Sequence, residues 1–389
     1  MENKKILWLC SWYPSKMEPF NGDFIQRHAR AAALFNNIHV IHVTYDFPNA
    51  AENPGQELNS NGQLREHIIY FKKKKSVKAK LTNQLRWLAL YKKAIRNYII
   101  KNGKPDLVHI HVPIKAGVLA LWMKKNYKIP YIITEHWGIY NDVVEDSYAS
   151  RGFAFKRYTK KIFQQASRFI SVSDYLAKGV NSLIGKKKYK IIPNTVDTDL
   201  FFYKEKETSV FRFIHVSNMV ALKNAEGILR SFKRFIQQNA NTELIMIGDN
   251  AIQLKDFAIS LDFPVGSVKF LGEIPYMEVA TEMQKADCLI LFSNIENSPC
   301  VIGEALCCGL PVITTNVGGI PELVDQSNAL IIKPKDEEAL TDAMHEMASG
   351  IKNYDRKKIA ENAIGKFSYS VIGKQIDAVY EEILATLKQ

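Results

Sequence analysis

Short apolar runs alternate with stretches of helical periodicity along this chain. In the first half the runs lie at 6–10, 38–43, 107–110, 131–134 and 169–172. Apolar residues recurring at helical spacing predict a helix over 23–35, between the first two runs. Strands that alternate with helices in this way predict an α/β domain built on a parallel sheet.

The same rhythm starts again after Pro193. Strands are predicted at 211–216, 243–247, 268–271, 288–292 and 312–314, and a helix at 225–236. The run at 288–292 is apolar without alternation, which is typical of a parallel strand buried on both faces. We therefore predict two doubly wound domains, 1–193 and 200–370, joined near Ile191–Phe201. Ligands of such sheets bind beyond the carboxyl ends of the strands, so substrates are expected in a cleft between facing domains.

Length and composition agree with two soluble domains. The chain has 389 residues, which is more than a domain with a single hydrophobic core usually contains, and 47% of them are hydrophobic. No apolar run is long enough to cross a bilayer, and the run at 6–10 is too short for a signal-peptide core. Five cysteines, an odd number without metal-ligand spacing, are expected to be small core side chains. We therefore expect a cytoplasmic protein.

The net charge of +12 is unevenly distributed. Residues 1–200 carry 33 Lys+Arg and 15 Asp+Glu, a balance of +18, and the remainder carries −6. Much of the excess lies in the segment 72–101, where lysines and arginines alternate with leucines and aromatic residues at helical spacing. A basic amphipathic helix of this kind can lie on an anionic membrane surface. The alternative is that its apolar side packs on its own domain. Nucleic acid is not expected, because no zinc-ligand spacing or RNA-binding signature accompanies the charge.

Two glutamates, Glu296 and Glu304, flank the end of a predicted strand and the start of a predicted helix. Ser298 is a suitable N-cap, and Pro299 then suits the first helical position. The unpaired N–H groups and positive dipole end of such a helix favour a pyrophosphate, and each carboxylate can accept hydrogen bonds from sugar hydroxyls. This arrangement fits a sugar nucleotide. The alternative is an ordinary helix start, where acidic residues are common for dipole reasons.

The residues around this pair resemble a known signature. Glu296, Glu304, Gly309–Ile313, Gly318–Gly319 and Glu322 resemble the donor site of retaining glycosyltransferases of family 4, which have the GT-B fold. Further matches in the same order cover nearly the whole chain. They are Pro14–Asp23, Asp106–His111, Thr134–His136, Ser173, Ile192–Asp197, Val268–Gly272 and Ala286–Asp287. The resemblance implies two Rossmann-like domains facing across a cleft, with a last helix, 371–389, that packs back on the first domain.

The resemblance also implies roles for individual residues. Glu296 would hold hydroxyls of the transferred sugar, and Glu304 would accept hydrogen bonds from the ribose of the nucleotide. Lys223 matches the phosphate-binding lysine, and His136 matches a histidine expected to bond the donor sugar at the reacting face. The remaining positions would act mainly through backbone groups: Asn297, Ser298, Cys300 and Val301 on the distal phosphate, Ile274 with Gly272 and Glu273 on the base edge, and Gly22 in a loop near phosphate or acceptor.

One position departs from the pattern. Asn218 stands where the family usually carries an arginine, five residues before the phosphate lysine. We therefore expect phosphate binding to depend more on Lys223 and the helix N-terminus. His109 and His111 alternate along a strand, and Asp197 and Asp199 imitate a cation-binding pair, but neither set has the further ligands or the location of a metal site. No metal or cofactor is expected.

These inferences predict transfer of a sugar from a nucleoside diphosphate donor, UDP or GDP, to a hydroxyl acceptor with retention at the anomeric carbon. The basic first half favours an acceptor that carries phosphate or lipid, such as a lipid-linked or polysaccharide precursor of a bacterial cell-surface glycan. It also leaves open a peripheral position at the inner face of the cell membrane. Two alternatives remain at this point: a sugar-nucleotide epimerase of related fold, and a non-catalytic protein that binds nucleotide sugars.

Overall fold

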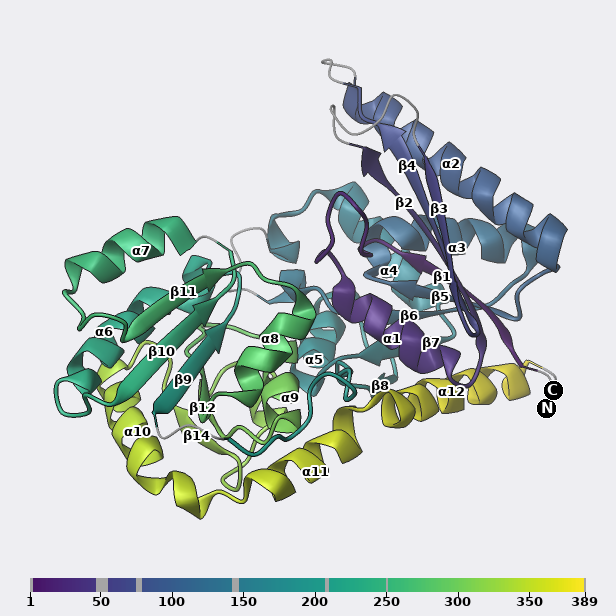
Figure 1. Cartoon of the computed structure of the whole chain (residues 1–389). Coiled ribbons are helices and arrows are strands. Elements are labelled where there is room, and N and C mark those ends of the chain that lie inside the picture. Colours follow the sequence, from purple (N-terminus) through teal and green to yellow (C-terminus); the bar gives the residue numbers. More distant parts are fainter. Residues whose placement is uncertain are drawn as a thin grey trace. The chain divides into compact units, whose positions relative to one another are not determined.

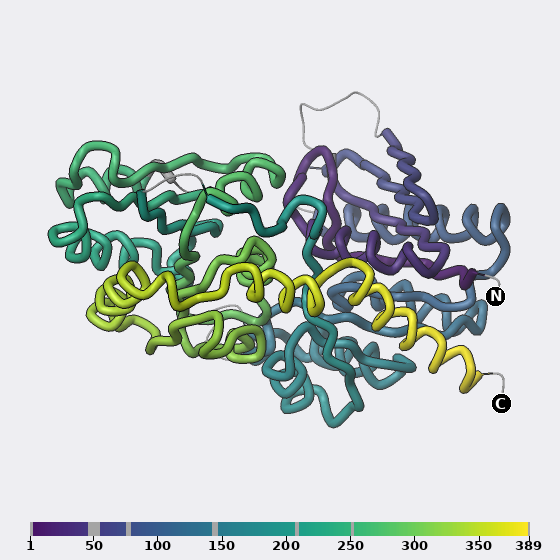
Figure 2. Tube along the Cα trace, turned by 60° about the horizontal axis from the view of Figure 1, so that its bottom comes forward, coloured from purple at the N-terminus to yellow at the C-terminus, as the bar shows by residue number. Residues whose placement is uncertain are grey.

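The computed structural model describes residues 3–46, 55–74, 79–141, 147–206, 210–249 and 251–387. These residues form two compact units. The N-terminal unit comprises Met1–Pro193 and Tyr369–Gln389, and the C-terminal unit comprises Asn194–Ser368. Figure 2 traces the chain from the first unit through the second and back to the first in its last helix.

The N-terminal unit is built on an eight-stranded sheet. Its strand order is β3-β4-β2-β1-β5-β6-β7-β8, and every neighbouring pair is parallel except β3 and β4. The strands are β1 (Lys5–Cys10), β2 (Asn37–Asp46), β3 (Gln56–Asn61), β4 (Leu64–Lys72), β5 (Leu107–His111), β6 (Tyr131–Glu135), β7 (Arg168–Ser171) and β8 (Tyr189–Ile191). The predicted strands of this half are present, with ends that move by one to three residues.

Helices cover this sheet (Figure 1). They are α1 (Asp23–Ala33), α2 (Ala79–Asn102), α3 (Pro113–Tyr127), α4 (Phe153–Gln165), α5 (Asp174–Ile184) and α12 (Tyr369–Thr386). α12 lies along α1, and Gly373 makes this close approach possible, because a Cβ there would lie 2.2 Å from the carbonyl oxygen of Ala31. Ile372, Ile376 and Tyr380 of α12 are buried in the core of this unit. The last helix therefore completes the N-terminal unit.

The C-terminal unit contains a six-stranded, fully parallel sheet in the order β11-β10-β9-β12-β13-β14. Its strands are β9 (Phe211–Val216), β10 (Thr242–Ile247), β11 (Val268–Gly272), β12 (Cys288–Leu291), β13 (Val312–Thr315) and β14 (Ala329–Ile332). Its helices are α6 (Ala225–Ile236), α7 (Ala251–Ser260), α8 (Tyr276–Gln284), α9 (Cys300–Cys307), α10 (Glu337–Gly350) and α11 (Arg356–Phe367). Separate apolar clusters occupy the two faces of the sheet, as a doubly wound fold requires.

One predicted helix start is wrong. Ser298 is not the N-cap of α9: Pro299 takes that position with extended backbone, the helix begins at Cys300, and no side chain caps it. The proline ring fixes φ near the value that this position needs, while its missing N–H costs nothing there. The first N–H groups of α9 are therefore not occupied by a side chain of the N-cap residue.

The strand order reverses once in each sheet. In the N-terminal sheet, β2 is added on one side of β1, and β5 and the strands that follow it are added on the other side. In the C-terminal sheet, β10 and β11 lie on one side of β9, and β12, β13 and β14 lie on the other. Loops that leave adjacent strands on opposite sides open a crevice at the carboxyl ends of those strands. The two reversal points therefore mark where each unit is able to receive a ligand.

Candidate functional site

Two loops meet at the reversal point of the C-terminal sheet. One follows β9 and ends in the short helix η3 (Ala221–Lys223), and the other runs from the end of β12 to α9. The backbone N–H of Asn294 donates to the carbonyl oxygen of Leu222 at 2.8 Å, which ties the two loops together. This connection brings Lys223 and Glu296, 73 residues apart in sequence, to the same place.

Lys223 and Glu296 form an ion pair. The Nζ atom of Lys223 lies 2.5 Å from Oε1 of Glu296, and the hydroxyl of Ser293 donates to the same oxygen at 2.8 Å. The Glu296 side chain is 9% exposed and that of Lys223 is 22% exposed. Water screens a pair in this setting less than it screens a surface salt bridge. The arrangement places one cation and one carboxylate at the point where phosphate and sugar are expected to lie.

Two consecutive glycines, Gly318 and Gly319, contact the backbone of Glu296. The N–H of Gly319 donates to the carbonyl oxygen of Glu296 at 3.1 Å. Gly318 has φ +56°, and a Cβ on it would lie 1.7 Å from the same carbonyl oxygen. Only glycine accepts both the left-handed backbone and the close approach. The glycines of the family signature therefore act here by fixing the backbone of Glu296.

Glu304 lies in the second turn of α9 and is 5% exposed. The hydroxyl of Tyr276, at the start of α8, donates to its Oε1 atom at 2.7 Å. This bond orients the carboxylate that is predicted to meet the ribose. Sequence reasoning did not identify Tyr276, since its only signal is its position two residues after Ile274.

The loop after β9 is shaped by residues that the sequence did not single out. His215 and the backbone N–H of Met219 both lie within hydrogen-bond distance of the Ser217 hydroxyl, at 2.7 and 3.0 Å. Met219 has φ +51°, a conformation that costs free energy in a non-glycine residue and is found at ligand-binding loops. Gly248 lies beneath this loop, where a Cβ would approach the carbonyl oxygen of Ser217 to 1.6 Å. Asn218 is therefore held on an exposed, constrained turn.

The other predicted donor residues surround α9 and the end of β11. Asn297 and Cys300 are partly exposed, and Ser298 is buried with its carbonyl oxygen accepting a hydrogen bond of 2.8 Å from the Asn194 amide. The side chains of Ile274 and Val301 pack against the core of the unit. For these two residues, backbone groups fit the predicted role better than side chains do.

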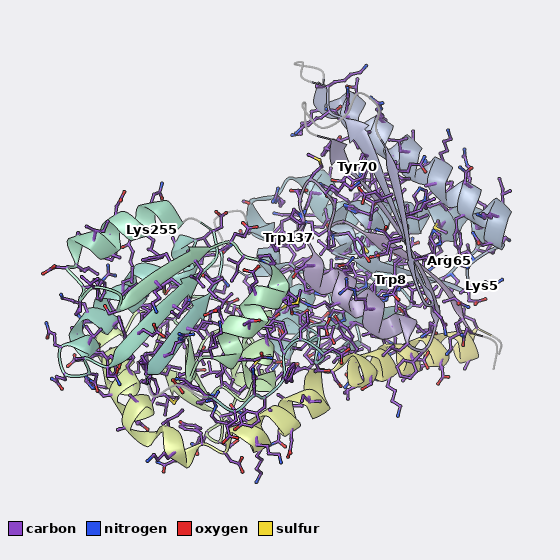
Figure 3. The ribbon with its side chains drawn as sticks, viewed as in Figure 1. Lys5, Trp8, Arg65, Tyr70, Trp137 and Lys255 are labelled. Carbon is purple, nitrogen blue, oxygen red and sulfur yellow. The ribbon has the colours of Figure 1, made fainter. Side chains whose placement is uncertain are left out.

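In the N-terminal unit His136 follows directly after β6, and Trp137, labelled in Figure 3, comes next. His136 is 9% exposed, and its Nε2 atom lies 3.1 Å from Nδ1 of the buried His111. Glu135 fixes this turn: one of its oxygens accepts the N–H groups of His136 and Trp137 at 2.9 Å each. Burial raises the pKa of Glu135 to about 7, although its hydrogen bonds oppose this shift.

Gly22 is the N-cap of α1 and is buried. Its φ is +75°, and a Cβ would lie 2.7 Å from the carbonyl carbon of Trp12. Glycine is therefore required by the path of the loop itself, and the predicted role toward phosphate or acceptor stays a prediction.

The residue sets that suggested metal binding have other partners. His109 lies within hydrogen-bond distance of Tyr380 and Thr134, at 2.7 Å each. The Asp197 carboxylate accepts the N–H of Asp199 at 3.2 Å. Across the described ranges, no group of three or more histidine, cysteine or acidic side chains is arranged to hold a metal ion.

Comparison with known protein families shows which family the chain belongs to. Residues 24–200 match the profile described as "Glycosyltransferase Family 4", and residues 197–366 match "Glycosyl transferases group 1". The chain belongs to glycosyltransferase family 4. The predicted family and the GT-B fold class are thereby confirmed.

Two curated relatives of this glycosyltransferase match different shares of its length. The "putative teichuronic acid biosynthesis glycosyltransferase TuaC" of Bacillus subtilis is 25% identical over 396 residues, covering 96% of this chain and 95% of the relative. Bacillus anthracis N-acetyl-alpha-D-glucosaminyl L-malate synthase is 23% identical over 236 residues, covering 57% of this chain and 60% of that enzyme.

Solved structures share the fold. Sucrose-phosphate synthase from Thermosynechococcus elongatus has a TM-score of 0.78 at 18% identity, covering 98% of this glycosyltransferase and all of that chain. Anabaena Alr3699/HepE in complex with UDP has a TM-score of 0.70 at 18% identity, covering 97% and 100%. Among the described residues, no helix of this glycosyltransferase combines the length and apolarity needed to cross a membrane.

Proposed function

We propose that this glycosyltransferase moves a sugar from a nucleoside diphosphate donor to a hydroxyl acceptor with retention at the anomeric carbon. The observation that carries the proposal is the meeting of Lys223 and Glu296 at the reversal point of the C-terminal sheet. A phosphate-binding cation and a sugar-binding carboxylate are needed side by side in a sugar nucleotide site, and this crevice is where such folds bind nucleotides.

The role proposed for each side chain follows from its charge. Lys223 offsets the negative charge that develops on the leaving diphosphate, together with the positive end of the α9 helix dipole. Glu296 accepts hydrogen bonds from the transferred sugar, and Glu304, oriented by Tyr276, accepts them from the ribose. His136 is assigned the predicted hydrogen bond to the donor sugar.

The proposed reaction has no covalent enzyme intermediate. Both glutamates have assigned binding roles, so the acceptor hydroxyl attacks from the face that the diphosphate leaves. The departing phosphate oxygen takes the acceptor proton as the new glycosidic bond forms. Lysine and helix dipole supply the charge stabilisation that a divalent cation gives in other sugar transferases, so we propose that no metal is required.

A UDP-sugar is the first donor to test, with GDP-sugars second. A solved structure of similar fold, Anabaena Alr3699/HepE, was determined with UDP and with UDP-glucose. TuaC is described by its role in teichuronic acid biosynthesis, which supports a polysaccharide or lipid-linked precursor in bacterial glycan synthesis as the acceptor.

The exposed surface of helix α2 is evidence for an acceptor that lies at a membrane. Its inner side packs on the unit through Tyr91, Ile95 and Tyr98, so the alternative of packing on its own domain is correct for that side. Its outer side exposes three large apolar residues, Leu81 (64%), Leu85 (58%) and Ile100 (83%). Exposed Arg86, Lys93 and Arg96 accompany them, whereas Lys75 and Lys78 of the predicted basic segment lie outside the described residues. We assign this outer stripe to peripheral contact with anionic lipid.

The test is a transfer reaction with UDP- and GDP-sugars and lipid-linked acceptors. We expect release of the nucleoside diphosphate only when acceptor is present, and a product whose anomeric configuration, measured by NMR, equals that of the donor. Glu304→Gln should lower the rate strongly in a folded protein. An isomerised donor without transfer would instead identify an epimerase, and binding without diphosphate release under any acceptor would identify a non-catalytic protein.

A further inference from the structure

A chain of hydrogen bonds crosses the reversal point between β9 and β12 in the C-terminal sheet. The paired register of these two strands covers only two residue pairs and ends one residue before the buried His215 of β9. The side chain of His215 continues the connection, because its Nδ1 atom lies 2.9 Å from the carbonyl oxygen of Ile290 in β12. Its other ring nitrogen, Nε2, lies 2.7 Å from the hydroxyl of Ser217. His215 therefore joins β12, which leads to Glu296, to the loop that carries Lys223.

The carbonyl group of Ile290 fixes the direction of every hydrogen bond in this chain. A carbonyl oxygen only accepts, so the proton of His215 lies on Nδ1. The Nε2 atom of the ring is then an acceptor, and the Ser217 hydroxyl donates to it. The same hydroxyl oxygen accepts the backbone N–H of Met219 at 3.0 Å. Burial, assisted by the charge of Lys223, lowers the pKa of His215 to about 4 although the bond to the backbone opposes this shift, so the ring is neutral near pH 7.

The last bond of the chain closes the turn at the start of this loop. Met219 has φ +51°, and a non-glycine residue keeps such a conformation only where the surrounding structure supports it. One support is its side chain, which is 8% exposed and packs in the apolar cluster that includes α6. The other is the bond from its N–H to Ser217. Because Lys223 follows only four residues later, the geometry of this turn determines where the lysine enters the site.

We infer that His215 and Ser217 are positioning residues for the loop that brings Lys223 to the diphosphate. Their hydrogen bonds attach the start of this loop to β12, and the backbone bond between the two loops attaches its end. The phosphate-binding cation and the sugar-binding carboxylate of Glu296 are thereby held on one frame. The inference rests on the proposed function, because it takes Lys223 to contact the second phosphate of a nucleoside diphosphate.

A positioning role predicts a selective loss of affinity. Ser217→Ala removes both the acceptor for the Met219 N–H and the donor to His215. We expect about five- to tenfold weaker binding of a nucleoside diphosphate, and less than about twofold weaker binding of the monophosphate, which lacks the second phosphate. A residue that only stabilises the fold would lower both affinities by the same factor, through the fraction of folded protein.

Substitutions of His215 separate its two hydrogen bonds. His215→Asn keeps an amide N–H near the position of Nδ1 but offers no acceptor to Ser217, so it should behave like Ser217→Ala. His215→Gln places an amide oxygen near the position of Nε2 and should retain most of the affinity for the diphosphate. The double variant His215→Asn with Ser217→Ala should lose no more than the weaker of the two single variants, because both remove the same bond.

Calorimetric titration of the full chain measures these effects, with UDP compared with UMP and GDP compared with GMP. Thr314→Val is the matched control. Thr314 is buried in β13, on the other side of β12 from β9, and its hydroxyl donates to the carbonyl oxygen of Leu291 at 3.0 Å. Its loss removes a buried hydrogen bond from the same sheet without touching the chain through His215. We therefore expect lower stability in this variant and an unchanged preference for the diphosphate.

The tautomer of His215 is read without any ligand, in the full chain labelled with ¹⁵N-histidine, by correlating ring nitrogens with carbon-bound ring protons. The signal is assigned by its loss in His215→Gln. We expect the Nδ1–H form, and an Nε2–H form in the wild type would overturn the inference.

The binding experiment separates the two levels of the proposal. An unchanged preference for the diphosphate in Ser217→Ala, beside a wild type that binds it, would refute the positioning role and leave the proposed function standing. A folded wild type that binds neither UDP nor GDP would refute the proposed function, and the positioning role with it.

Discussion

Oε1 of Glu296 lies 2.5 Å from Nζ of Lys223 and 2.8 Å from the hydroxyl of Ser293. The lysine that is assigned to phosphate is thus balanced by the carboxylate that is assigned to sugar. A nucleoside diphosphate that takes the ammonium group has to compete with Glu296 for it. The pair therefore links phosphate binding to the position of the sugar-binding carboxylate.

Glu296→Gln should separate binding from transfer. Removing the carboxylate frees the charge of Lys223, and an ion pair worth about 1 kcal/mol corresponds to roughly fivefold tighter binding of a nucleoside diphosphate. Transfer should fall by about 100-fold or more, because the sugar loses its partner in the transition state. Calorimetric titration and rate measurements check both effects. Ser293→Ala is the matched control, since it removes a bond to the same oxygen without changing charge, and weaker diphosphate binding by Glu296→Gln would contradict the competition.

Gly318→Ala should destabilise the protein and abolish transfer. A left-handed alanine costs about 1 kcal/mol, and its Cβ would collide with the carbonyl oxygen of Glu296, so we expect a loss of at least about 2 kcal/mol in the free energy of unfolding. Gly365→Ala in α11 is the control: its Cβ would meet nothing within 4 Å, and it should stabilise by roughly 0.5 kcal/mol. Urea unfolding measures both, and equal stability of the two variants would refute the role of Gly318.

The unfolding free energy should depend on the ionisation of Glu135. Burial raises its pKa to about 7 in the folded protein from an ordinary value of 4.5. Folding therefore favours the protonated form, and its contribution to stability is full below pH 4.5 and is lost as the pH rises through 7. The loss amounts to about 3 kcal/mol. Urea unfolding at pH 5 and pH 8 should show a smaller pH difference for Glu135→Gln than for the wild type, and an identical difference would contradict the assignment.

The alternation of apolar runs and helical periodicity predicts most of the parallel strands, because strands buried on both faces are read directly from composition. It does not predict the short strands β8 and β14 at the edges of the sheets. The hairpin of β3 and β4 escaped prediction, since β3 is mostly polar and exposed, as edge strands are. Ser298 was mistaken for a cap because proline can occupy either of two neighbouring positions at a helix start.

The sequence predicts only part of the candidate site. Lys223, Glu296 and Glu304 belong to a spaced signature, whereas their supporting partners do not. Tyr276 reaches Glu304 through a tertiary contact between segments that are distant in sequence, whereas Ser293, three residues before Glu296, lies in the same loop. No local pattern encodes such contacts, so they became visible only when the strand order was known.

Binding to anionic vesicles should depend on the outer side of α2. The double substitution Leu81→Ser and Leu85→Ser removes two exposed apolar side chains, and we expect at least tenfold weaker partition onto vesicles of phosphatidylglycerol and phosphatidylcholine. Co-sedimentation at low and high salt measures this. Ile259→Ser on α7 removes an even more exposed apolar residue, 76% accessible, and should leave vesicle binding unchanged. Unaltered vesicle binding by the double variant would refute the assignment.

In the proposed function, the C-terminal unit binds the diphosphate of a sugar nucleotide through Lys223. This role is tested by calorimetric titration of the full chain with UDP and GDP, using Lys223→Met and, as a control, Lys255→Met; Lys255 is an exposed lysine of α7 labelled in Figure 3. We expect one of the two nucleotides to bind the wild type and Lys255→Met equally, and Lys223→Met to weaken this binding at least tenfold. A folded wild type that binds neither nucleotide, or undiminished binding by Lys223→Met, would contradict it.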